Sequence, residues 1–329
     1  MRANEHSGFR DFGGLVLGLS AALAVGCGRQ QAKVPLVVLH CDELTVLFRG
    51  IEPVFERASR GVDVRAESAP TLATIRKLTD FSRGCDLIAT ADPDLLRRML
   101  RPKAAQWVAA FASDEIGIAA IDRSRYVHEM DADNWYQVLR RPDVSFARVE
   151  ERLDPCGLYT MMAWRLADQH YSPAGKSPIS ETLAKACEPN NVRPSAGDLL
   201  TLLETPSGPD YVFVYRSVAE QHRLRFVALP EAINLGRLEL ANDYAKAQVT
   251  TTDEAGHEQV LSGRPVLFAL AVPVKAAHPV EAIELARFLL DKPGQRALQQ
   301  ASLRPVVPAR AGAGEVVPER LKPYVEAAE

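Results

Sequence analysis

The stretch PLVVLHCDELTVLFRGIEPVFERASRGVDVRAE, residues 35–67, decides the fold. Its first six residues are a continuous apolar run, which is typical of a strand buried on both faces. Apolar residues at helical spacing follow and predict a helix that Pro53 kinks or ends; they are Leu44, Leu47, Phe48, Ile51 and Phe55. Residues 62–67 then alternate between apolar and polar, as a half-buried strand does. This order of elements predicts a parallel sheet covered by helices.

The same alternation continues and predicts a second α/β unit. A short helix at 72–78 and a buried strand at 86–90 belong to the first unit, and the second unit begins after the apolar run at 116–122. Asp154 is a good N-cap before Pro155, and Ser195 with Asp198 resembles a capping pair. Strands are predicted at 211–215, 225–229 and 266–272, with a late helix at 280–290, whereas 251–265 is polar and turn-rich. Two such units joined by crossing strands would enclose a cleft beside strand ends and helix N-termini.

The N-terminus predicts export and a lipid anchor. Two arginines precede the apolar run GGLVLGLSAALAVG at 13–26, which is too short to span a bilayer and fits a signal peptide. The order LAVGC at 23–27 resembles a bacterial lipobox, in which the cysteine is lipid-modified. We therefore expect a signal peptide at 1–26, a lipidated Cys27, and a short polar tether that ends at residue 33.

The composition of the chain argues against several classes of function. The chain has 329 residues, is 47% hydrophobic and carries a formal net charge of −3, without the basic footprint that nucleic-acid binding needs. Four cysteines remain after Cys27, which permits up to two disulfides in three pairings; they are Cys41, Cys85, Cys156 and Cys187. Neither a structural zinc motif nor a recognisable hydrolase or nucleotide-binding motif occurs, so an enzyme is the least favoured class.

Five stretches give the chain a family resemblance: ATADPDLL, NWYQVLRRPDV, DPCG, YVFVYRSVAEQH and LPEAINLG. Together they resemble the tungstate/molybdate-binding proteins of ABC importers, in the archaeal-type subgroup, from about residue 34 to about residue 295. The resemblance implies a type II periplasmic-binding-protein fold, with lobe I at 34–122 plus 262–329 and lobe II at 123–261. It also implies an ABC permease and ATPase as partners, a monomer, and a bound oxyanion without any cofactor.

The resemblance also implies the ligand residues. In the subgroup two carboxylates bind the metal centre of the oxyanion, and they fall here on Asp154 and Glu204. One extra residue before Tyr211 makes the register at Glu204 weaker. Loops of the first lobe hold the oxygens of the oxyanion, and this chain places Cys41, Asp42, Glu43 and Thr71 there. Cys156 and Tyr215 are further candidates near the cleft, and no catalytic residue is expected.

The first loop departs from the family pattern, because carboxylates near a dianion cost several kcal/mol unless they point away or are protonated. In one interpretation Asp42 caps the following helix and Glu43 lies in its first turn. In another, the ligand is a divalent cation, held by a set of acids and thiols: Cys41, Asp42, Glu43, Asp154, Cys156 and Glu204. A third interpretation is a sensor or interaction lipoprotein that has lost transport. A lone histidine near the cleft, His40, is more often structural than catalytic.

Overall fold

The computed structural model describes residues 32–171, 177–252 and 256–327. The predicted signal peptide and Cys27 lie outside these residues. In the described part of the chain no helix is both long and apolar enough to cross a membrane.

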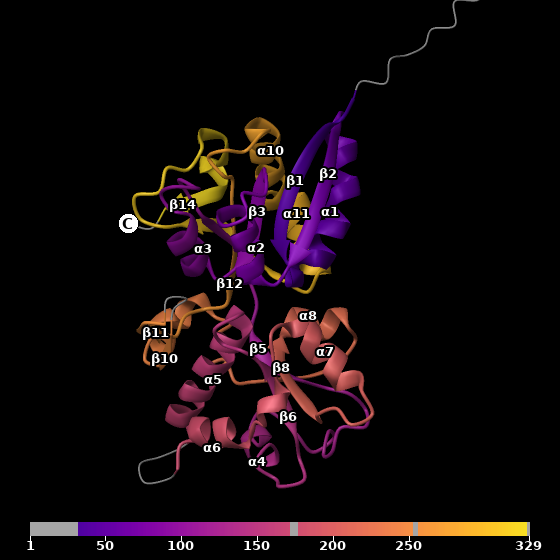
Figure 1. The fold of residues 1–329 in the computed structure, drawn as a ribbon, viewed down its shortest axis with the longest axis vertical. Helices are drawn as coiled ribbons and strands as arrows, with labels where there is room; N and C mark the ends of the chain where they lie inside the picture. The colour runs from indigo at the N-terminus through magenta and orange to yellow at the C-terminus, as the bar shows by residue number, and fades with distance from the viewer. Residues whose placement is uncertain (1–31, 172–176, 253–255, 328–329) are drawn as a thin grey trace, which may run out of the picture. The chain divides into compact units, whose positions relative to one another are not determined.

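The first sheet has seven strands of mixed direction, in the order β14-β13-β4-β12-β3-β1-β2, and Figure 1 shows β1 beside β2 in it. The strand β1 pairs in parallel with both β2 and β3, whereas β12 is antiparallel to β3 and β4. The strands are β1 (Val34–Cys41), β2 (Val62–Ala69), β3 (Leu87–Ala91), β4 (Ala109–Ser113), β12 (Leu267–Ala271), β13 (Arg304–Ala311) and β14 (Val325–Ala327). The apolar run at 35–40 thus forms a strand with partners on both sides, as its composition predicts.

Helices flank this sheet. They are α1 (Thr45–Ala58), α2 (Thr71–Thr79), α3 (Pro93–Leu100), α10 (Pro279–Leu290) and α11 (Lys292–Gln300), with the short 3-10 segments η1 (Asp42–Leu44) and η4 (Glu319–Tyr324). Helix α1 buries the predicted apolar face, including Leu47 and Phe48, and it continues beyond Pro53 to Ala58. Of the two outcomes predicted for Pro53, a kink or an end of the helix, the end is wrong, since the buried Ile51 and Phe55 on either side of Pro53 hold the last turns in place.

The second sheet has five strands, in the order β7-β6-β8-β5-β9. Its strands are β5 (Ile116–Ala120), β6 (Phe146–Val149), β7 (Val192–Arg193), β8 (Tyr211–Tyr215) and β9 (Arg225–Ala228). Its helices are α4 (Trp135–Val138), α5 (Pro155–Tyr171), α6 (Ile179–Ala186), α7 (Ala196–Glu204), α8 (Arg216–Gln221) and α9 (Ala241–Tyr244), with η2 (Pro189–Asn191) and η3 (Leu238–Leu240). The chain passes from the seven-stranded sheet to the five-stranded sheet between β4 and β5. This crossing comes before the lobe boundary that we predicted at residue 122.

Two connections join the sheets. The first runs from β4 to β5 through Asp114 and Glu115, and the second leads into β12 through Arg264 and Pro265. The backbone N–H of Asp114 donates to the carbonyl of Val266 at 3.2 Å, so the two connections lie side by side. The segment before β12, predicted only as turn-rich, forms a hairpin of β10 (Gln248–Thr252) and β11 (Glu258–Ser262) that contacts α5.

Both predicted helix-start signals are confirmed. The Ser195 hydroxyl accepts a hydrogen bond from the backbone N–H of Asp198 at 3.2 Å and caps α7. The Asp154 carboxyl accepts one from the N–H of Cys156 at 2.9 Å, directly before α5. Each side chain thereby satisfies an N–H group that has no partner within its own helix.

Candidate functional site

Asp154 connects elements of the two sheets. While Oδ1 caps α5, Oδ2 accepts a hydrogen bond from the backbone N–H of Thr71, the first residue of α2, at 3.3 Å. The side chain is buried, and only 3% of the residue is exposed. One carboxyl group therefore meets the N-terminal ends of two helices, where the backbone favours negative charge.

Glu43 is a second buried acid close to Asp154. It lies in η1, immediately beyond the carboxyl end of β1, and is 4% exposed. Burial, and then the negative charge of Asp154, raise the pKa of Glu43 to about 8. Burial likewise raises the pKa of Asp154 to about 6. Because a low-dielectric site disfavours two negative charges, Glu43 keeps its proton at neutral pH while Asp154 is mostly ionised.

Three buried oxygens around these acids have no hydrogen-bond partner among the described residues: Glu43 Oε2, Thr71 Oγ1 and the Tyr215 hydroxyl. Thr71 and Tyr215 are fully buried. Burial raises the pKa of the Tyr215 hydroxyl, and electrostatic interactions with the Cys156 thiol and then with both acids raise it further. Since nearly all buried polar groups in proteins are paired, this arrangement suits a small polar ligand with several hydrogen-bonding atoms.

Two small cavities flank the acids. One, of about 240 Å³, is lined by Asp154 together with Arg98, Arg152 and side chains of the β10–β11 hairpin. The other, of about 220 Å³, is lined by Glu43 and by residues of α7 and α8. Volumes of this size suit an ion or a very small molecule, because pockets for larger ligands begin at roughly 300 Å³.

The predicted partner of Asp154, Glu204, lies elsewhere. It is the last residue of α7, it is exposed, and it lines the cavity of Glu43 and Asp42 but not the cavity of Asp154. Asp42 is the first residue of η1 and makes no capping bond, since Cys41 occupies the cap position. The interpretation of Asp42 as a cap is therefore wrong. Glu43 lies in the first turn as predicted, but its carboxyl group is buried.

The cysteines near the site are thiols. Cys41 and Cys156 are buried and free, and burial raises the pKa of both. Cys85 and Cys187 are free as well, so neither disulfide that the sequence permits is formed among the described cysteines. Among the described residues, no three His, Cys, Asp or Glu side chains lie close enough together to hold a metal ion. The interpretation that acids and thiols of the cleft bind a divalent cation therefore receives no support.

His40 has a structural environment. Its ring stacks on Phe48 with the ring centroids 4.6 Å apart, and its Nδ1 is 2.8 Å from the carbonyl oxygen of Cys41. Burial lowers the pKa of this histidine. The structural interpretation from the sequence is consistent with these contacts.

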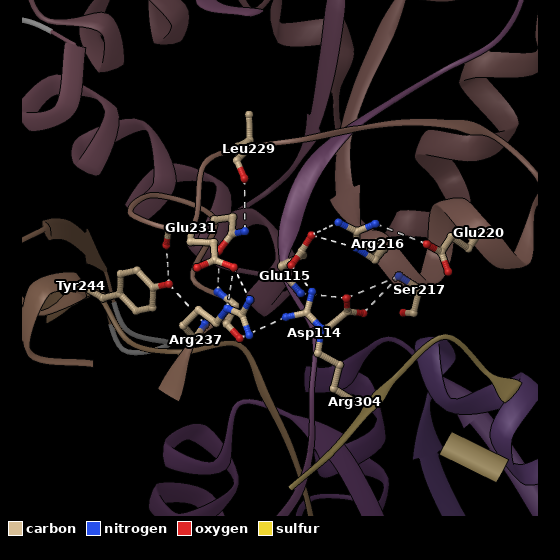
Figure 2. Close-up of polar contacts among 12 residues, drawn as sticks. Asp114, Glu115, Arg216, Ser217, Glu220, Leu229, Glu231, Arg237, Tyr244 and Arg304 are labelled. Atoms are coloured by element: carbon tan, nitrogen blue, oxygen red, sulfur yellow. Dashed lines mark hydrogen bonds and ion pairs between the residues drawn. The ribbon is translucent and has the colours of Figure 1, made fainter. Parts of the chain in front are cut away.

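The sequence analysis missed the acids at the first connection between the sheets (Figure 2). Glu115 is 3% exposed and pairs with Arg216 of α8, whose Nε lies 2.8 Å from Oε1, and with Arg304 of β13. The neighbouring Asp114 accepts a hydrogen bond from the Ser217 N–H at 3.3 Å, and burial raises its pKa to about 7. The sequence did contain a signal for this site, because the two adjacent acids interrupt two apolar strand segments. They connect elements of both sheets at the point where the chain crosses.

Comparisons with known proteins agree with this architecture. A family model described as bacterial extracellular solute-binding protein matches residues 36–304. An uncharacterized solute-binding protein of Petrotoga mobilis is 35% identical over 88% of this chain and 90% of its own length. A molybdate/tungstate-binding protein of Thermococcus kodakarensis is 33% identical over 94% of this chain and 95% of its own length.

A solved structure shares the fold. The periplasmic molybdate-binding protein of Azotobacter vinelandii superposes with a TM-score of 0.57 at 12% identity, covering 86% of this chain and all of that one. Together with the two sheets, this likeness confirms the predicted periplasmic-binding-protein fold.

Proposed function

Because this chain belongs to the bacterial extracellular solute-binding protein family, whose members serve ABC-type importers, we propose that it captures molybdate or tungstate. The name of the Thermococcus kodakarensis relative supports this ligand. So does the small buried site around Asp154, which offers hydroxyl groups to the oxygens of an oxyanion and one ionised carboxyl group to its metal centre.

The position of Asp154 is the observation on which the proposal depends. A carboxylate next to a dianion is repelled by roughly 4 kcal/mol per pair of unit charges at ~4 Å and an effective dielectric constant of ~20. Direct bonding of a carboxylate oxygen to tungsten or molybdenum would offset this repulsion. The N-terminal end of α2 and the hydroxyl of Thr71 would stabilise the oxyanion oxygens.

Export and anchoring complete the proposal. The lipid on Cys27 would hold the protein at the membrane surface, within reach of the permease that receives the ligand. A Cys27→Ala variant should then appear in the soluble fraction of cells, whereas the unaltered protein stays with the membranes. Equal membrane association of both proteins would remove the anchor from the account.

The ligand is tested by native mass spectrometry of the purified protein with tungstate, molybdate, sulfate, Ca²⁺ and Zn²⁺ in separate samples. We expect one bound tungstate or molybdate and no specific cation adduct. A cation adduct without any oxyanion adduct would reverse the proposed ligand class. Binding of none of these ions would favour the sensor or interaction lipoprotein.

A further inference from the structure

Glu43 occupies the place where ligands bind in α/β proteins. It follows the carboxyl end of β1, a strand with partners on both sides, and precedes α1. Ligands in such folds lie outside the carboxyl ends of the strands, where the connections to the helices expose polar groups. Nevertheless, Glu43 is buried and its Oε2 has no hydrogen-bond partner among the described residues.

No cation among the groups that interact with Glu43 in the described part of the chain compensates for this burial. A buried acid normally pairs with a cation, but the groups that interact with Glu43 are the acids Asp154 and Asp42, the Cys41 thiol and its own backbone. Leaving a buried polar atom unpaired costs about 1–3 kcal/mol. Such a cost is common at binding sites, where a ligand supplies the missing contact.

Glu43 and Asp154 also share their surroundings. Both interact electrostatically with the Cys156 thiol and with the unpartnered hydroxyl of Tyr215. Glu43 lies in η1, directly after β1 of the seven-stranded sheet, and Asp154 lies directly before α5, a helix that packs on the five-stranded sheet. The two carboxyl groups therefore interact with each other although each lines a cavity of its own, and Glu43 is buried whereas Glu204, which lines the same cavity as Glu43, is exposed.

We infer that Glu43, and not Glu204, is the second carboxyl group of the ligand site, and that it donates a hydrogen bond to an oxygen of the bound oxyanion. This inference rests on the proposed function. A protonated carboxyl group is a hydrogen-bond donor and adds no negative charge beside the dianion, so it removes the electrostatic objection to an acid in this loop. The raised pKa of Glu43 agrees with this role.

Three variants test the inference. Glu43→Met keeps the side-chain volume but removes the donor, and Glu43→Gln keeps a donor of nearly the same shape. Glu204→Gln is the matched control on the exposed acid. Removing an unpaired buried polar group should not destabilise the fold, so Glu43→Met should unfold at the same or a higher temperature than the unaltered protein.

Isothermal titration calorimetry with sodium tungstate gives the readout. We expect Glu43→Met to bind at least about tenfold more weakly, Glu43→Gln to stay within about threefold, and Glu204→Gln to be unchanged. Unaltered binding by Glu43→Met, or an equally large loss in Glu43→Gln, would overturn the inference. Failure of the unaltered protein to bind any oxyanion would instead overturn the proposed function, so the two failures are distinguishable.

Discussion

The buried carboxyl group of Glu43 makes the stability of the ligand-free protein depend on pH in a predictable direction. Its pKa is about 8 in the folded chain, against an ordinary value of 4.5. Between these two values the folded state binds more protons than the unfolded state. The free energy of unfolding therefore falls as pH rises through this window. Asp154, at about 6, and Asp114, at about 7, contribute with the same sign over narrower windows.

The size of the effect follows from the same values. Each pH unit within the window costs up to about 1.4 kcal/mol for one group. From about pH 5.5 to about pH 7.5, Glu43 should thus lower the free energy of unfolding by roughly 2–3 kcal/mol. The Glu43→Met variant lacks this contribution, so its stability relative to the unaltered protein should rise by that amount over the same interval.

Urea unfolding followed by tryptophan fluorescence measures the difference. All three tryptophans are buried, which makes their emission sensitive to loss of the core; they are Trp107, Trp135 and Trp164. The exposed Glu204 supplies the control, because Glu204→Gln should show a pH dependence like that of the unaltered protein. A difference between Glu43→Met and the unaltered protein that stays constant from pH 5.5 to pH 7.5 would refute this account of Glu43.

Three further outcomes are expected. Thr71→Val, which removes only the unpartnered hydroxyl, should weaken tungstate binding by about 1 kcal/mol in calorimetry; an unchanged affinity would exclude this hydroxyl from the site. Glu115→Gln should lower the free energy of unfolding by about 2 kcal/mol in urea, because Arg216 and Arg304 lose their shared carboxylate; a neutral effect would show that solvent already screens these pairs. In intact-protein mass spectrometry under non-reducing conditions, an alkylating reagent applied in urea should modify Cys85 and the other three described cysteines, whereas a protected pair would contradict the free thiols.

Much of the fold was predictable because local patterns and burial agree. The apolar run at 35–40 became β1, and Asp154 and Ser195 cap their helices as predicted. Other features depend on tertiary packing, which no local pattern reveals. Helix α1 continues through Pro53, and the polar segment before β12 pairs as a hairpin on α5.

The site was less predictable, for the same reason. An acid in the first turn of a helix is usually solvated, so no local pattern indicated that Glu43 would be buried beside Asp154. The choice of Glu204 came from a family resemblance in which the register of that residue was weak. In the structure this residue is exposed at the end of α7. Chain position alone did not indicate which acids would approach Asp154 from the other sheet.

Calorimetric titration of tungstate into the unaltered protein and into Asp154→Asn tests the coordination chemistry most directly. The amide of this variant keeps an oxygen for the cap of α5 but loses the negative charge that would bind the metal centre. We predict one tungstate bound by the unaltered protein and an affinity at least roughly a hundredfold lower for Asp154→Asn, which corresponds to ~3 kcal/mol. Equal affinities for a folded variant would contradict the central role of Asp154.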